Sequence, residues 1–121
     1  MAYLDYEKLD VYRMAMELAL LVDKTIEKIP AHRAYLIDQM RRSSSSVVLN
    51  IAEGAGEHAA LEKRRFYRMA KRSATECAST MELCWRLVLI EEERYLLVRT
   101  QAIRVVAMLT RLFQARTLPV P

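Results

Sequence analysis

Apolar side chains recur along most of this chain at intervals of three and four residues, the spacing that aligns them on one face of an α-helix. The intervals can be followed through four segments: residues 11–28, 34–54, 59–89 and 92–116. They leave a lead-in at residues 1–9 and a tail at residues 117–121. No segment shows the alternation of period two that marks a half-buried strand. The pattern predicts an all-α protein, an antiparallel up-down four-helix bundle formed by one domain.

Each predicted helix has one apolar stripe that we expect to face the core. The stripe of the first helix is Val11, Met14, Leu18, Leu21, Val22 and Ile29. The stripe of the second is Ile37, Met40, Ser44, Val47 and Ile51. The stripe of the third is Phe66, Ala70, Ala74, Cys77, Met81, Cys84 and Val88. The stripe of the fourth is Tyr95, Val98, Ala102, Val106, Leu109 and Phe113.

Residues that start or stop helices lie near the expected boundaries. Asp10 is placed to cap the first helix, and the Ile29-Pro30 pair ends it, because a residue before proline leaves the helical region. Gly54 is placed to end the second helix in the left-handed conformation that glycine adopts most easily. Glu91, Glu92 and Glu93 suit the start of the fourth helix, where the helix dipole favours negative charge.

The composition and the two cysteines indicate the class of protein and its cellular compartment. Hydrophobic residues make up 53% and charged residues 28% of the 121 positions, which is usual for a globular domain and excludes disorder. No run of eighteen apolar residues occurs, so we expect no membrane partner. Cys77 and Cys84 lie seven residues apart, about 10 Å along a helix, which is too far for a disulfide within it. Reduced thiols and a cytoplasmic location are therefore expected.

Residues that could carry catalysis are sparse. His32 and His58 both fall at predicted turns and have no partner motif, and no phosphate-binding loop or paired-cysteine motif is present. A di-iron bundle would need Glu-x-x-His on two helices, and neither histidine follows a glutamate at that spacing. We therefore expect no enzymatic activity, no metal, no cofactor and no small-molecule substrate.

The second helix has a polar row beside its core stripe: Gln39, Ser43, Ser46, Asn50 and Glu53. The spacing of four, three, four and three places the row on one side of the helix. One interpretation is a solvated face. The other is a second packed face, because serines allow close helix approach, and Asn50 and Glu53 would then need hydrogen-bond partners. The packed interpretation predicts that this face lies between subunits of an oligomer.

Positive charge is unevenly distributed, although the net charge is only +4. Segment 63–72 holds six basic residues and no acidic one, and the chain from Arg94 onward holds five arginines and no acid. The candidate contacts for nucleic acid are Arg64, Arg68, Lys71, Arg72, Arg104 and Arg111. Such rows are either a solvated surface or contacts to phosphate, which needs clustered charge but no special geometry.

Residues 38–54, DQMRRSSSSVVLNIAEG, closely resemble the signature of a bacterial family of four-helix-bundle proteins. These proteins were first noticed as reading frames in intervening sequences of large-subunit ribosomal RNA genes. Residues 9–18, 62–70 and 76–83 are similar to further patterns of the family, so the resemblance extends over nearly the whole chain. The chain departs from the family at residues 89–93, LIEEE, where members have a glycine or tyrosine turn followed by Ser-Glu-Glu-Glu.

The resemblance implies a ring-like homopentamer of four-helix protomers and leaves the biochemical role open. A related protein is the accessory variability determinant of diversity-generating retroelements, a basic pentameric bundle that binds a reverse transcriptase and RNA. Two hypotheses follow. One is a non-catalytic accessory protein that binds RNA, a reverse transcriptase or both, and the acid-free C-terminal segment favours it. The other is a structural or protein-interaction module without a nucleic-acid role.

Overall fold

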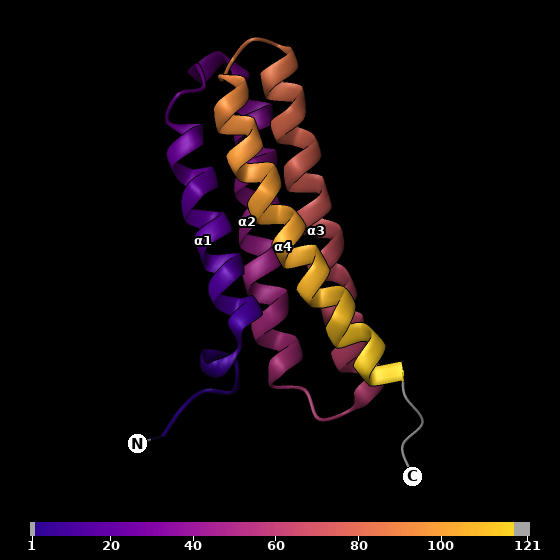
Figure 1. Cartoon of the computed structure of the whole chain (residues 1–121). Coiled ribbons are helices and arrows are strands. Elements are labelled where there is room, and N and C mark those ends of the chain that lie inside the picture. The colour runs from indigo at the N-terminus through magenta and orange to yellow at the C-terminus, as the bar shows by residue number, and fades with distance from the viewer. Residues whose placement is uncertain (1, 118–121) are drawn as a thin grey trace.

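The computed structural model describes residues 2–117, with side chains over residues 2–112. The chain forms a short 3₁₀ turn η1 (Asp5–Lys8), then α1 (Asp10–Ile26), a second 3₁₀ turn η2 (Ala31–Arg33), α2 (Ala34–Ala55), α3 (Ala60–Arg86) and α4 (Glu92–Thr117). Successive helices run in opposite directions, and the start of α1 and the end of α4 lie at the same end of the bundle (Figure 1). The helices contact one another in the pairs α1–α2, α2–α3, α3–α4 and α1–α4. The predicted all-α four-helix bundle is confirmed.

Most predicted core positions are buried, and the errors are shifts of one residue. In α3 the buried aromatic residue is Tyr67, whereas Phe66 is only half-buried and lies under the guanidinium of Arg65. In α4 the buried residue is Val105, and Val106 packs at the edge of the core. Both errors have one cause: the apolar residues are adjacent, and periodicity alone leaves the phase of the face uncertain by about 100°.

Similar shifts occur at the rim of the core. In α2, Leu36 is buried, while Ile37 packs against the core from its edge, as Met14 and Leu21 of α1 do. Gln101 of α4 is a buried polar residue that the apolar pattern did not identify. The predicted core position Phe113 lies outside the described side chains.

The first helix begins and ends slightly differently from the prediction. Leu9, with φ −85° and ψ 125°, is the residue that precedes α1, and no side chain caps the helix. Asp10 is the first helical residue, and its carboxylate accepts a hydrogen bond from Arg13 at 3.1 Å. The helix ends at Ile26 rather than at residue 28, and Ile29 is buried in the turn before Pro30.

The α2–α3 connection corrects the assignment of Gly54. No described glycine has a positive φ, and Gly54 lies within α2, which continues to Ala55. A Cβ atom on Gly54 would lie 2.7 Å from Cε1 of Tyr67, so the glycine is required by close packing rather than by backbone conformation. The C-cap is Gly56, with an ordinary φ of −85°.

The α3–α4 connection contains the one left-handed residue among those described. The third helix ends at Arg86 instead of residue 89, and Val88 has φ 61°. The backbone N–H of Leu89 donates to Cys84 O and that of Val88 to Trp85 O, both at 2.9 Å, which is the pattern of a Schellman C-cap. Val88, predicted to be a core residue, is 89% exposed because this turn directs it away from the bundle.

Candidate nucleic-acid interface

The polar row of α2 packs against α3 of the same chain. Ser43 is buried, and its side chain is hydrogen-bonded to Cys77 of α3. Three residues further along, the hydroxyl of Ser73 donates to Ser46 Oγ at 2.9 Å. Gln39, at the start of the row, lines a groove shared with α3. The row therefore belongs to the intramolecular seam between α2 and α3.

Asn50 and Glu53 occupy the other end of the row. The Asn50 amide is half-buried, and Nδ2 donates to the backbone oxygen of Ser46 at 2.8 Å and to its hydroxyl at 2.9 Å. Glu53 is exposed. The middle of the row is thus packed against α3, as the second interpretation predicted, whereas Glu53 at its end is in solvent, as the first predicted. Because α3 covers the serines, this row does not require a second subunit.

The two thiols of α3 face the interior. Burial raises the pKa of Cys77 to about 11, and the hydrogen bond with Ser43 opposes that change. Burial also raises the pKa of Cys84. A thiol that stays protonated is a poor nucleophile, so these cysteines act as small packing residues.

Lys63 is hydrogen-bonded to the C-terminal end of α2, where residues 38–54 end. Its Nζ donates to the backbone oxygens of Gly54 at 2.8 Å and Ala55 at 3.1 Å. These carbonyl groups belong to the last turn of α2, where helix carbonyls lack intrahelical partners, and Gly54 O also accepts from the backbone N–H of Glu57 at 3.2 Å. One of the six basic residues of segment 63–72 is therefore used to hold the α2–α3 connection.

Three predicted basic residues form a row on α3 beside α4. Arg64, Arg68 and Lys71 are spaced by four and three residues, and Thr75 and Ala78 continue that spacing. Thr75 and Ala78 line a groove of about 340 Å³ together with residues of α4. The basic row therefore lies on the flank of α3 that faces α4.

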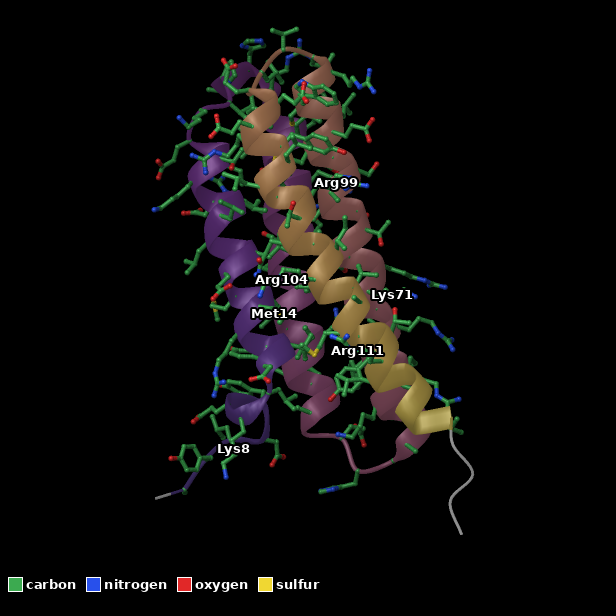
Figure 2. The ribbon with its side chains drawn as sticks, in the orientation of Figure 1. Lys8, Met14, Lys71, Arg99, Arg104 and Arg111 are labelled. Carbon is green, nitrogen blue, oxygen red and sulfur yellow. The ribbon has the colours of Figure 1, made fainter. Side chains whose placement is uncertain are left out.

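The two predicted arginines of α4 lie on its other flank. Arg104 Nη1 donates to the Gln101 amide oxygen at 3.2 Å, and Gln101 Nε2 donates to the backbone oxygen of Met14 in α1 at 2.9 Å. Arg111 lies seven residues after Arg104 and so projects on the same side. Figure 2 shows Arg104 on the α1 side of α4, near Met14, and Lys71 on the α3 side. Five of the six candidates thus divide between two flanks. The sixth, Arg72, is exposed on α3 but directly follows Lys71, so it projects about 100° around the helix from the row.

One arginine that the sequence reasoning did not select joins the α3 row. Arg99 is exposed and lines the α3–α4 groove, with Ala102, Ile103 and Val106 from the same helix. Arg99 lies four residues before Ile103 and seven before Val106, and this spacing could have indicated that it shares their face of α4. Figure 2 places Arg99 and Lys71 on the same side of α4. We call Arg64, Arg68, Lys71 and Arg99 the α3–α4 basic flank.

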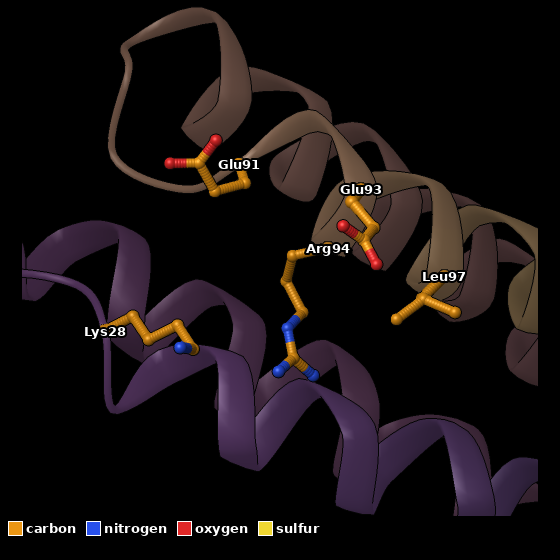
Figure 3. A pocket seen from close by; sticks show the side chains of 5 residues that line it. All are labelled: Lys28, Glu91, Glu93, Arg94 and Leu97. Atoms are coloured by element: carbon orange, nitrogen blue, oxygen red, sulfur yellow. The ribbon is translucent and has the colours of Figure 1, made fainter.

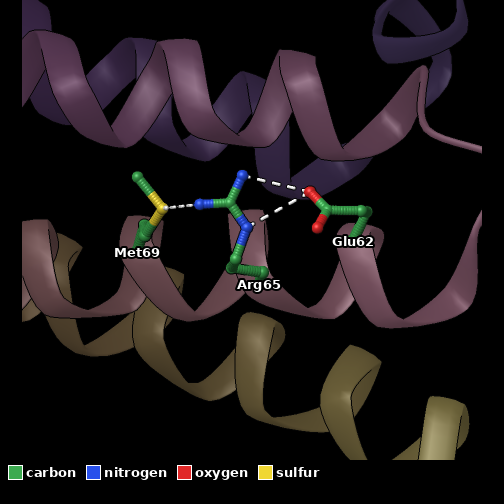
Figure 4. A network of polar contacts seen from close by, with 3 residues as sticks. All are labelled: Glu62, Arg65 and Met69. Atoms are coloured by element: carbon green, nitrogen blue, oxygen red, sulfur yellow. Dashed lines mark hydrogen bonds and ion pairs between the residues drawn. The ribbon is translucent and has the colours of Figure 1, made fainter.

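Electrostatics set this flank apart from the rest of the bundle. Segments 63–75 and 94–117 contain no acidic residue, and the packing of α3 against α4 places Ala74 and Thr75 beside residues 99–107. At the edge of the flank, Arg65 pairs with Glu62 at 3.0 Å and contacts Met69 Sδ at 3.8 Å (Figure 4). On α1, Arg13 pairs with Asp10 at 3.1 Å, and at the end of α3 Arg86 pairs with Glu82 at 3.6 Å.

A further groove lies at the start of α4 and is lined mainly by charged residues. Figure 3 shows a groove of about 230 Å³ in which Arg94 extends between Lys28 and Leu97, with Glu91 and Glu93 at its rim. His32 and His58 are both exposed. Within the described part of the chain, no group of three or more histidine, cysteine, aspartate or glutamate side chains is arranged to hold a metal ion. None of the helices described is both long enough and apolar enough to span a bilayer.

Comparison with known proteins identifies the family. The family described as 23S rRNA-intervening sequence protein matches residues 7–111. This chain is a member of that family. A solved structure from Bacteroides thetaiotaomicron VPI-5482, described as a protein with unknown function from the S23 ribosomal protein family, is similar with a TM-score of 0.79 and 19% sequence identity. The similarity covers 85% of this chain and 97% of that one, and it shows the shared fold.

The intervening-sequence family membership agrees with the resemblance carried by residues 38–54. In this member, the structure gives that signature a physical meaning: its serines form the α2–α3 seam, and its final glycine makes room for Tyr67. The comparison with curated proteins found no match.

Proposed function

We propose that this intervening-sequence family protein is a non-catalytic RNA-binding protein whose α3–α4 basic flank contacts phosphate. The observation that carries the proposal is the packing of α3 against α4, which places the end of the acid-free segment 63–75 beside residues 99–107 of the acid-free segment 94–117. A surface rich in cations attracts the phosphate backbone without regard to base sequence. The family's name, which refers to 23S rRNA, is consistent with an RNA partner.

The side chains best placed for this contact are Arg68, Lys71 and Arg99. Arg68 and Arg99 are exposed and Lys71 is half-buried, and Arg99 lines the α3–α4 groove. Long basic side chains reach phosphates from a helix surface while their stems pack on the protein. Each contact releases counterions, so the affinity should fall with salt by about 0.7 in log K per contact for a single-stranded RNA.

The test is a titration of a generic RNA by fluorescence anisotropy at several salt concentrations. We expect the triple variant Arg68→Gln, Lys71→Gln, Arg99→Gln to flatten the salt slope by about 2, since three contacts are removed. A second variant, Arg104→Gln with Arg111→Gln, removes charge from the α1 side of α4. If the α3–α4 basic flank is the binding surface, this double variant should reduce the salt dependence of log K less than the triple variant does.

The matched control is Arg13→Gln, Arg41→Gln, Arg86→Gln, which removes the same charge from exposed positions on α1, α2 and α3. It separates a defined surface from a general effect of net charge. Equal loss of binding in both triple variants would contradict a localised interface. No binding by the parent protein at about 50 mM salt, where phosphate contacts are strong, would contradict RNA binding altogether.

A second proposal concerns association, and exposed leucines between α1 and α4 favour it. Leu96 and Leu97 are 45% and 50% exposed, and with Leu21 they line a groove of about 630 Å³. Covering such side chains in a homo-oligomer, or with a protein partner such as a reverse transcriptase, would remove apolar surface from water. The family resemblance implies five copies.

Light scattering measures this directly. A mass near 14.1 kDa at micromolar concentration would mean a monomer and would contradict the homo-oligomer. If the protein is an oligomer held through this groove, Leu97→Glu should dissociate it while circular dichroism shows the helices intact. An unchanged mass in that variant would exclude the α1–α4 groove as the interface.

A further inference from the structure

The α3–α4 basic flank has a geometry that discriminates between forms of RNA. We propose that it binds double-stranded RNA in preference to single strands. This inference rests on the proposed RNA binding and adds the form of RNA that the surface fits. It follows from how the cations are arranged and from what the neighbouring aromatic rings contact.

The cations project from a row of backbone positions that two packed helices fix. Arg64 and Lys71 lie on one helix with about 10 Å of axial rise between them. Arg99 comes from α4 and lines the same groove as Ala78, which is a further seven residues beyond Lys71. The row therefore extends over about 20 Å of two packed helices. A rigid row of this kind suits phosphates whose spacing is already fixed, as in a duplex.

The aromatic residues near the row are engaged with the protein itself. Tyr67 is buried against Gly54, and the ring of Phe66 lies 4.9 Å from the guanidinium of Arg65. At the far end of α3, Trp85 stacks on Tyr95 with ring centroids 5.1 Å apart. Among the described side chains of α3, the rings of Tyr67 and Trp85 are therefore covered by the protein, and the half-buried ring of Phe66 has Arg65 over one face.

Single strands and duplexes place different demands on such a surface. A flexible strand loses conformational freedom on binding, and proteins that hold it offset that loss by stacking bases on aromatic rings. A duplex is already ordered, keeps its bases stacked internally and presents a higher density of phosphate charge. Cations beside rings that the protein largely covers thus favour the duplex.

The experiment uses two complementary RNA strands of unbiased sequence, measured separately and after annealing. Anisotropy titrations of the full chain at about 50 mM salt should show the duplex bound about tenfold more tightly than either strand. A tenfold ratio corresponds to about 1.4 kcal/mol, which is the size of the stacking contribution of one base that a single strand would lack on this surface. Equal affinity, or tighter binding of the separate strands, would overturn the duplex inference while leaving RNA binding in place. No binding of any of the three RNAs would overturn the proposed function and this inference together.

The variants locate the preference on the surface. The triple variant Arg68→Gln, Lys71→Gln, Arg99→Gln should reduce the duplex affinity more than the single-strand affinity and so narrow the ratio. The control Arg13→Gln, Arg41→Gln, Arg86→Gln should keep the ratio while circular dichroism confirms that both variants are helical. A ratio that stays unchanged in the first variant, or narrows equally in the control, would mean that the α3–α4 basic flank does not select the duplex.

Discussion

The α2–α3 and α3–α4 connections differ in a way that reverses the usual roles of glycine and valine: the glycines have ordinary φ angles, and a valine has the positive one. In the first, Gly54 and Gly56 are available, yet the described backbone has no glycine with a positive φ. In the second, Val88 takes φ 61°, a conformation that is unfavourable for a β-branched residue. The comparison teaches that Gly54 is needed for space, whereas the turn that needs conformational freedom has no glycine.

The seam beside the first connection explains this difference. Gly54 lets the Tyr67 ring approach α2, and Lys63 binds the carbonyl oxygens at the end of the helix. These contacts define the connection through packing and hydrogen bonds. The second connection instead relies on backbone hydrogen bonds around Val88, which projects into solvent. Substitutions in the two connections should therefore have opposite signs.

The largest effect is expected from Gly54→Ala. The added Cβ would lie 2.7 and 2.9 Å from two ring atoms of buried Tyr67, and we expect the free energy of unfolding to fall by about 3 kcal/mol. Urea denaturation measures it. The matched control is Gly56→Ala, where the nearest atom is 3.8 Å away and φ is ordinary, so the change should stay within about 0.5 kcal/mol. Equal losses in the two variants would show that space is not what Gly54 provides.

Alkaline pH should weaken the α2–α3 seam through Cys77. Its pKa is 9.0 for a free thiol and about 11 in the folded protein, so the unfolded chain ionises first. The contribution of the neutral thiol is complete below pH 9 and is lost as the pH rises to 11, by about 2 kcal/mol. Chemical denaturation at pH 8 and pH 10.5 should show this loss. In Cys77→Ala the loss should be smaller, and an equal loss would assign it to other groups.

Val88→Gly should stabilise the protein, in contrast to the substitution at Gly54. Glycine adopts positive φ without a steric penalty, so the free energy of unfolding should rise by about 1 kcal/mol. Thermal denaturation measures the gain as a higher Tm. Val88→Ala retains a Cβ and should recover only part of it. A lower Tm in the glycine variant would mean that the valine side chain contributes a contact that the solvent-exposed turn does not reveal.

The smallest effect is expected at the helix end that Lys63 satisfies. Lys63→Met keeps the aliphatic stem but removes the two hydrogen bonds to Gly54 and Ala55, and should lower the free energy of unfolding by about 1 kcal/mol. Lys24→Met, at an exposed position of α1, is the control and should change little. If the two lysine variants were equally stable, the connection would depend on the Gly54–Tyr67 packing alone.

The number, order and approximate lengths of the helices could be predicted from local spacing. Leu18, Met40, Met81 and Leu109 are all buried as expected, because a strong period fixes which side of each helix is apolar. The choice between neighbouring apolar residues could not be made in this way. Phe66 and Tyr67 have similar hydrophobic content, and the approach of α2 at Gly54 decides which ring enters the core.

For the candidate interface, the sequence identified the charge and the structure determined its distribution. The lack of acidic residues around Arg68 and after Arg94 is a property of the sequence alone. The separation of Arg104 from Lys71, and the inclusion of Arg99 beside Lys71, depend on how α4 is rotated against α1 and α3. That rotation is set by packing across the bundle, such as the bond from Gln101 to Met14.

The sequence by itself therefore determined the four helices, the family signature and the basic character of one half of the chain, since each is a pattern within a single segment. Only the tertiary structure decided what covers the Ser43–Ser46 face, why Gly54 is a glycine and which cations share a surface. These depend on residues from different helices meeting in space. Periodicity fixes a helix face to within about one residue, and a shift of one residue rotates a side chain by about 100° and changes its neighbour.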